Sequence, residues 1–154
     1  MSVQAHEHLP LATVVQLASI TLREFQWTMP DIQVPGGLQI FLNPSFALNF
    51  GSAEGTVAYR IITTLPGAVQ IEDQLTEIFK LTATLQAHFT FPAENTYELR
   101  EYKSFGDLSV FPMVYPYIRE LVNNTAYRAG LPGIFLAPLP YNRLTQSPVE
   151  LAES

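Results

Sequence analysis

Apolar and polar side chains alternate strictly over residues 79–91. The odd positions from Phe79 to Phe91 are all apolar, and the even positions from Lys80 to Thr90 are all polar. Because side chains alternate between the two faces of a β-strand, this pattern predicts a long strand with one apolar and one solvent-facing side. A helix would scatter the same residues around its axis. Such a strand needs neighbouring strands and a covering layer over its apolar face.

Three further stretches are typical of strands of the same sheet. Residues 11–27 change parity twice, which predicts a strand with bulges or a kink. Residues 38–50 are interrupted at Asn43-Pro44, and residues 57–65 alternate until Pro66-Gly67 ends the pattern, with residues 68–73 as a link. Most connections are short, so we expect a four-stranded antiparallel sheet. Residues 28–37 are predicted to form a crossover loop rich in proline and glycine.

The hydrophobic period changes after Pro92. Residues 95–105 predict a short helix that Gly106 and Asp107 end, and residues 111–128 predict a second helix. Residues 131–144 are apolar and rich in proline, which favours an extended segment along the sheet edge. We therefore expect one α+β domain over residues 1–154, with the two helices on one side of the sheet and loose tails at residues 1–10 and 145–154.

Composition narrows the classes of function. Charged residues make up only 14% of the chain, which favours an obligate oligomer that covers part of its surface. The net charge of −6 argues against nucleic acid, and the absence of cysteine excludes disulfides and thiolate chemistry. No apolar run is long enough to span a membrane, and the N-terminal residues do not have the pattern of a signal peptide, so we expect a cytoplasmic protein.

The residue types that carry catalysis form no convincing site. His6 and His8 are an isolated pair with no third ligand nearby, so no metal is predicted. Glu98 and Glu101 flank Arg100 and Lys103, which favours an ion-paired helix face over an acid–base pair. No nucleotide-binding or nucleophile motif is present. We expect neither an enzyme nor a cofactor.

Apolar and aromatic residues are more numerous than one sheet and two helices need to bury. Two interpretations are open at this point. The surplus can fill the core and an interface between copies of the chain, or it can form a groove that binds extended apolar polypeptide. An exposed sheet edge can also accept a guest strand through main-chain hydrogen bonds.

Two segments carry a resemblance to a known family. Residues 115–120, YPYIRE, resemble the F-P-Y-A-R-E motif that opens the long helix of the SecB export chaperones, and residues 128–141 are similar to the R-G-x-F-P-x-L-x-L-A-P-V-N-F run of that family. The resemblance covers about residues 13–144. It implies a four-stranded antiparallel sheet with two helices, assembled as a homotetrameric dimer of dimers.

The resemblance also implies positions for binding sites. The client-binding positions of the family correspond to Phe46, Leu48 and Phe50, with Leu42, Trp27 and Tyr141 as further candidates. Glu24 corresponds to one acidic position through which the family docks on the SecA motor. The other acidic positions hold Thr28, Lys80 and Thr82 here.

The function that the resemblance implies is ATP-independent holding of unfolded precursor proteins before export. Since most of the acidic docking patch is missing, the alternative is a dedicated adaptor or single-client chaperone, for example one associated with a toxin–antitoxin pair, without delivery to SecA. The expected partners are unfolded precursor polypeptides and further copies of the chain, with no nucleic acid and no insertion into a membrane.

Overall fold

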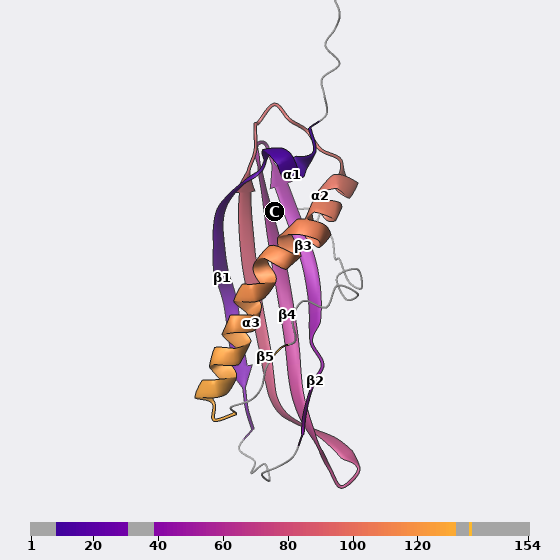
Figure 1. Ribbon diagram of the computed structural model, residues 1–154, viewed down its shortest axis with the longest axis vertical. Coiled ribbons are helices and arrows are strands. Elements are labelled where there is room, and N and C mark those ends of the chain that lie inside the picture. Colours follow the sequence, from indigo (N-terminus) through magenta and orange to yellow (C-terminus); the bar gives the residue numbers. More distant parts are fainter. Residues whose placement is uncertain (1–8, 31–38, 132–135, 137–154) are drawn as a thin grey trace, which may run out of the picture.

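The computed structural model describes residues 9–30, 39–131 and 136 of the chain. An antiparallel sheet carries helices on one face, as Figure 1 shows. Its strands are β1 (Gln16–Thr28), β2 (Ile40–Leu42), β3 (Ser45–Ala53), β4 (Thr56–Ile71) and β5 (Gln74–Thr90). Because β2 and β3 both pair with β4, the sheet is four strands wide, in the order β1, β5, β4 and then β2 with β3. The predicted α+β architecture is confirmed.

The helices form one nearly continuous arm. They are α2 (Leu99–Phe105), the π-helical turn η1 (Gly106–Val110) and α3 (Phe111–Arg128), preceded in the chain by the single turn α1 (Leu11–Val14). In Figure 1, α3 crosses the sheet obliquely, and it contacts β4 and β5. Residues 11–14, which the sequence analysis assigned to the first strand, are helical, and the strand begins at Gln16.

The β4–β5 hairpin is longer than the sequence predicted. Strand β4 continues through Pro66 to Ile71, and a two-residue turn at Glu72 and Asp73, with φ of 50° and 66°, leads directly into β5. Residues 68–73 are therefore not a link, and the predicted end at Pro66 is wrong. The Pro66 carbonyl accepts a hydrogen bond from the Asn43 N–H, so this edge of Pro66 faces the interruption between β2 and β3. The Pro66 nitrogen points to the same side, where no strand residue is paired with it. Its missing N–H therefore costs no ladder hydrogen bond.

Gly106 does not end the helix, as the sequence analysis expected. Its backbone is right-handed helical, with φ of −59° and ψ of −49°, and the arm passes through it into η1. A Cβ added at Gly106 would lie 2.7 Å from Leu48 Cδ2 and 2.9 Å from Tyr59 Cε1. The glycine therefore serves close approach of the helical arm to the sheet.

Replacing Gly106 with alanine is expected to destabilise the folded chain by about 2 kcal/mol, because the added methyl overpacks a closed contact. Helix propensity alone predicts the opposite sign, a gain of about 1 kcal/mol. Urea unfolding of Gly106→Ala and of the exposed helix variant Ser104→Ala measures the difference. An unchanged or increased unfolding free energy for Gly106→Ala contradicts the close approach.

Candidate functional site

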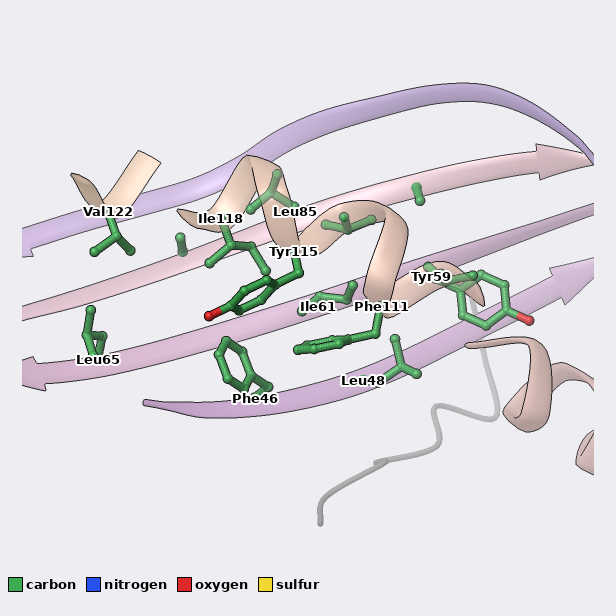
Figure 2. Close-up of a cluster of buried hydrophobic side chains, with 14 of the residues drawn as sticks. Phe46, Leu48, Tyr59, Ile61, Leu65, Leu85, Phe111, Tyr115, Ile118 and Val122 are labelled. Atoms are coloured by element: carbon green, nitrogen blue, oxygen red, sulfur yellow. The ribbon is translucent and has the colours of Figure 1, made fainter. Parts of the chain in front are cut away.

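The three strand residues expected to contact a client lie under the helical arm. Figure 2 shows Phe46 facing Phe111 and Tyr115 of α3, and the ring centroids lie 5.0 and 5.8 Å from that of Phe46. The exposed fractions of Phe46, Leu48 and Phe50 are 8%, 7% and 5%. Binding a client would need these side chains to be uncovered, and in the folded chain they are covered. Their contact with a client stays a prediction, and it requires the helical arm to move.

A row of apolar side chains on β1 lies on the same sheet face but beyond the cover of α3. The register of β1 against β5 shifts between Leu17 and Ser19 and again between Leu22 and Glu24. These two irregularities reverse the parity twice, as the sequence predicted, so every apolar residue of the row pairs with an inner-face residue of β5. We call this row the β1 stripe: Leu17, Ile20, Leu22, Phe25 and Trp27.

The β1 stripe remains accessible in the folded chain. Leu17, Leu22 and Phe25 are 46%, 49% and 41% exposed. Strand β1 is also an edge of the sheet, because it pairs with β5 alone among the described strands. An apolar row along an unpaired strand edge combines two features that bind extended polypeptide, namely side chains to bury and main-chain groups to pair.

Trp27 and Leu42, two further client-binding candidates, lie at one end of this face. The Trp27 ring stacks on Phe79, with centroids 4.7 Å apart and ring planes inclined by 16°. Phe79 pairs across the sheet with Gly67, whose partner on the other side is Leu42. Trp27 and Leu42 are both half-buried, on either side of a Phe79–Gly67 contact that the sequence analysis did not single out. Tyr141 lies outside the described residues.

Side chains of α3 hold the main chain of Leu136. Arg119 Nε donates to the Leu136 carbonyl at 2.9 Å, and the Leu136 N–H donates to Asn123 Oδ1 at 3.3 Å. Arg119 and Asn123 are four residues apart and so lie on one face of the helix. Leu136 itself is buried against the core. The segment 131–144 was expected along the sheet edge, but its residue 136 is fastened to α3, so the two motifs of the resemblance contact each other.

A buried tyrosine joins the sheet to the beginning of the helical arm. The Tyr59 hydroxyl donates to the Tyr102 carbonyl at 2.7 Å. Burial raises the pKa of Tyr59 far above its usual value, and the nearby Tyr102 and Asp107 raise it further. Burial also raises the pKa of Asp107, against the lowering effect of Lys103. Tyr59 is therefore neutral in the folded chain at any physiological pH.

The raised pKa of Tyr59 makes folding sensitive to alkali. The pKa of Tyr59 is higher in the folded chain than the value of about 10 in the unfolded chain. Its contribution to the unfolding free energy is therefore fully present below about pH 10 and is lost as the pH rises above about 10. Between pH 9.5 and 11 we expect Tyr59 to account for a loss of about 1 kcal/mol of unfolding free energy. Urea unfolding at both pH values should show a smaller loss for Tyr59→Phe and the wild-type loss for the exposed control Tyr127→Phe. Equal losses in wild type and Tyr59→Phe contradict the prediction.

The outer face of the sheet, opposite α3, carries Glu24. This predicted motor-docking residue is exposed on β1 and pairs with Thr84 of β5. Its neighbours on the same face include Thr82, and Thr28 pairs with Lys80 further along. The other positions that are acidic in the SecB export chaperones therefore carry the hydroxyl groups of Thr28 and Thr82 and the ammonium group of Lys80.

The remaining polar residues that the sequence singled out are histidines and the charged residues of the short helix. Over residues 9–30, 39–131 and 136, no three metal-ligating side chains gather, and His6 and His8 lie outside these ranges. Arg100 and Glu98 form the ion pair expected on the short helix, at 3.0 Å and exposed to solvent. None of the helices within these ranges has the length and apolar character of a membrane span.

Comparison with known proteins gives the fold a name. No protein-family model matches the chain. No curated protein matches it either. Among solved structures, the Mycobacterium tuberculosis Rv1957 SecB-like chaperone, in complex with a ChAD peptide from the Rv1956 HigA1 antitoxin, superimposes with a TM-score of 0.70. It shares 23% sequence identity, and the match covers 84% of this chain and 94% of that one. The chain has the SecB-like fold.

A second solved structure overlaps less closely. A protein of unknown function from Streptococcus agalactiae gives a TM-score of 0.46 at 9% identity, over 80% of this chain and 96% of that one. Within the SecB-like fold of this chain, the contact of Arg119 and Asn123 with Leu136 joins the two segments that suggested the family from sequence. Among the exposed apolar side chains of the described residues, those of the β1 stripe follow one another along a single strand edge.

Proposed function

We propose that this protein is an ATP-independent chaperone that holds non-native polypeptide on the β1 stripe. The observation that carries the proposal is the exposure of Leu17, Leu22 and Phe25 along an edge strand of the SecB-like fold. Apolar surface that a client covers contributes roughly 25 cal/mol per Å². The half-buried Trp27 and Leu42 extend the same surface toward the crossover.

Holding a client in this way depends on several weak contacts acting together. Main-chain pairing at a strand edge and apolar burial both make little demand on the client sequence. We propose that the chain assembles as a dimer of dimers in the cytoplasm, so that one long client engages several stripes at once. Linked sites raise the overall affinity well above that of each contact. Size-exclusion chromatography with light scattering tests the assembly.

A second candidate is a dedicated adaptor or single-client chaperone without delivery to the SecA motor. It is favoured by the outer face, where Thr28, Lys80 and Thr82 stand at positions that are acidic in the export chaperones and only Glu24 keeps its charge. The structural neighbour Rv1957 was solved with a peptide from an antitoxin. Under this second candidate, the chain would bind one dedicated polypeptide client and not many unrelated ones.

The refolding of an unrelated client tests the first candidate against the second. Purified protein is mixed with each of several slowly refolding proteins, and their refolding rate and aggregation are followed. Retardation of most clients at stoichiometric amounts supports general holding. If no client is retarded but one native protein is bound tightly, the adaptor candidate is supported. If neither result is obtained, the chaperone proposal is overturned.

A further inference from the structure

A hollow with both polar and apolar lining lies on the outer face of the sheet, opposite the β1 stripe and the helical arm. It has a volume of about 310 Å³ and lies between the β3–β4 turn and the middle of β5. Asn49 of β3, Arg60 of β4 and Gln86 of β5 form one row across it, because each pairs with the next in the sheet register. His88 follows in the next row, opposite Ala58. We call this hollow the outer-face pocket.

Hydrogen-bond donors converge on the outer-face pocket. Arg60 Nε donates to Gln86 Oε1 at 3.1 Å, which fixes the guanidinium plane and leaves its terminal nitrogens to bind an outside acceptor. Asn49 is only 6% exposed, and its Oδ1 has no hydrogen-bond partner in the described part of the chain. Because Oδ1 is an acceptor, a main-chain N–H of a partner polypeptide would satisfy it, whereas a carboxylate would not. His88, half-buried, adds a ring N–H.

The charge of the outer-face pocket is opposite to that of the whole chain. The chain has 14 acidic against 8 basic residues, yet no aspartate or glutamate is among the described residues that line the pocket. The nearest acid in sequence, Glu54, is exposed on the adjoining turn and is not part of the lining. A fixed guanidinium with amide and imidazole donors matches a carboxylate, which can accept two parallel hydrogen bonds from arginine.

We propose that the outer-face pocket binds an acidic side chain of a partner polypeptide. Apolar lining from Ala53 and Ala58 gives room for the methylene groups that carry a glutamate carboxylate, which a free small anion does not need. This site is separate from the proposed client surface, because it lies on the other face of the sheet. The partner contact is thus with an acidic segment, whereas the family to which the sequence shows resemblance docks its motor through acidic residues of its own.

Binding of a defined acidic peptide tests the proposal. Hexaglutamate with a neutral N-terminal fluorophore is titrated with the full chain, and fluorescence anisotropy is followed, with hexaglutamine as the uncharged peptide. We expect hexaglutamate to bind and hexaglutamine not to bind. We expect Arg60→Gln to weaken the affinity for hexaglutamate about tenfold or more. The matched control is Lys80→Gln, which removes the same charge from the same face outside the pocket. Thermal unfolding of both variants shows that each is folded.

Each remaining outcome overturns the proposal. If Lys80→Gln weakens binding as much as Arg60→Gln, the attraction belongs to the whole face and not to the pocket. If inorganic phosphate displaces the peptide at equal concentration, the pocket takes a simple anion instead of a polypeptide side chain. If hexaglutamate does not bind at millimolar concentration, or if Arg60→Gln changes only the thermal midpoint, Arg60 serves the sheet alone. Retardation of client refolding should be unchanged in Arg60→Gln, which separates this test from that of the chaperone proposal.

Discussion

Replacing Gly67 with alanine is expected to destabilise the folded chain by about 3 kcal/mol, since overpacking a closed core contact costs of this order. A Cβ at Gly67 would fall within the ring of Phe79, its cross-strand partner. The ring cannot simply turn away, because Phe79 is fully buried and stacks on Trp27. Alanine is otherwise better than glycine in a strand by about 0.5–1 kcal/mol, so the sign of the effect is itself informative. Urea unfolding measures it.

A double-mutant cycle with Phe79→Leu isolates the cause of this loss. Leucine removes the part of the ring that the new methyl would meet, so in that background Gly67→Ala should cost less than about 1 kcal/mol. The fluorescence of Trp27, the only tryptophan of the chain, should change in Gly67→Ala as the stacked ring is displaced. An equal cost of Gly67→Ala in both backgrounds shows that the Phe79 ring is not responsible.

Local pattern was sufficient to predict most of the sheet. The alternation over residues 79–91 identified β5 from Phe79 to its end at Thr90 and its buried side, which the structure confirms. The two parity changes before Trp27 predicted the irregularities that keep the β1 stripe on one face. These features follow from the geometry of a single strand, in which each residue specifies its own face.

Features that depend on a neighbouring segment were not predictable in the same way. Pro66 reads as the end of a strand, and only the interruption of the adjacent strand at Asn43 and Pro44 makes it acceptable within β4. Gly106 reads as a helix stop, and only the approach of Leu48 and Tyr59 shows why glycine is there. In each case the role of the residue depends on a contact with residues far away in the sequence.

The candidate site shows the same limit more sharply. The stretch Phe46, Leu48 and Phe50 and the β1 stripe have similar patterns of apolar residues, and both lie on the inner face of the sheet. Only the oblique path of the helical arm decides that the first set is covered and the second is not. The sequence predicted which apolar residues lie on the inner face of the sheet, but it did not predict which of them the helical arm covers.

Replacing both Leu22 and Phe25 with serine is expected to weaken the holding of unfolded clients about tenfold or more. Both side chains are about half exposed, so their loss removes only part of their contacts with the sheet, and urea unfolding should show that the variant is still folded. Together they offer on the order of 150 Å² of apolar surface, worth up to about 4 kcal/mol if a client covers it all at roughly 25 cal/mol per Å². Part of this is offset by the ordering of the client, and about 1.4 kcal/mol is already tenfold in affinity.

The concentration of protein that halves the refolding rate of a client measures this effect. The matched control replaces Leu75 and Leu108, which are 68% and 73% exposed but lie outside the β1 stripe. That variant should hold clients as well as wild type does, because neither leucine belongs to the continuous apolar row of the β1 stripe. If both variants hold clients equally well, the β1 stripe is not the client surface. If the Leu22 and Phe25 variant changes its oligomeric state in light scattering and loses holding with it, the stripe is an interface between copies of the chain, and clients bind elsewhere.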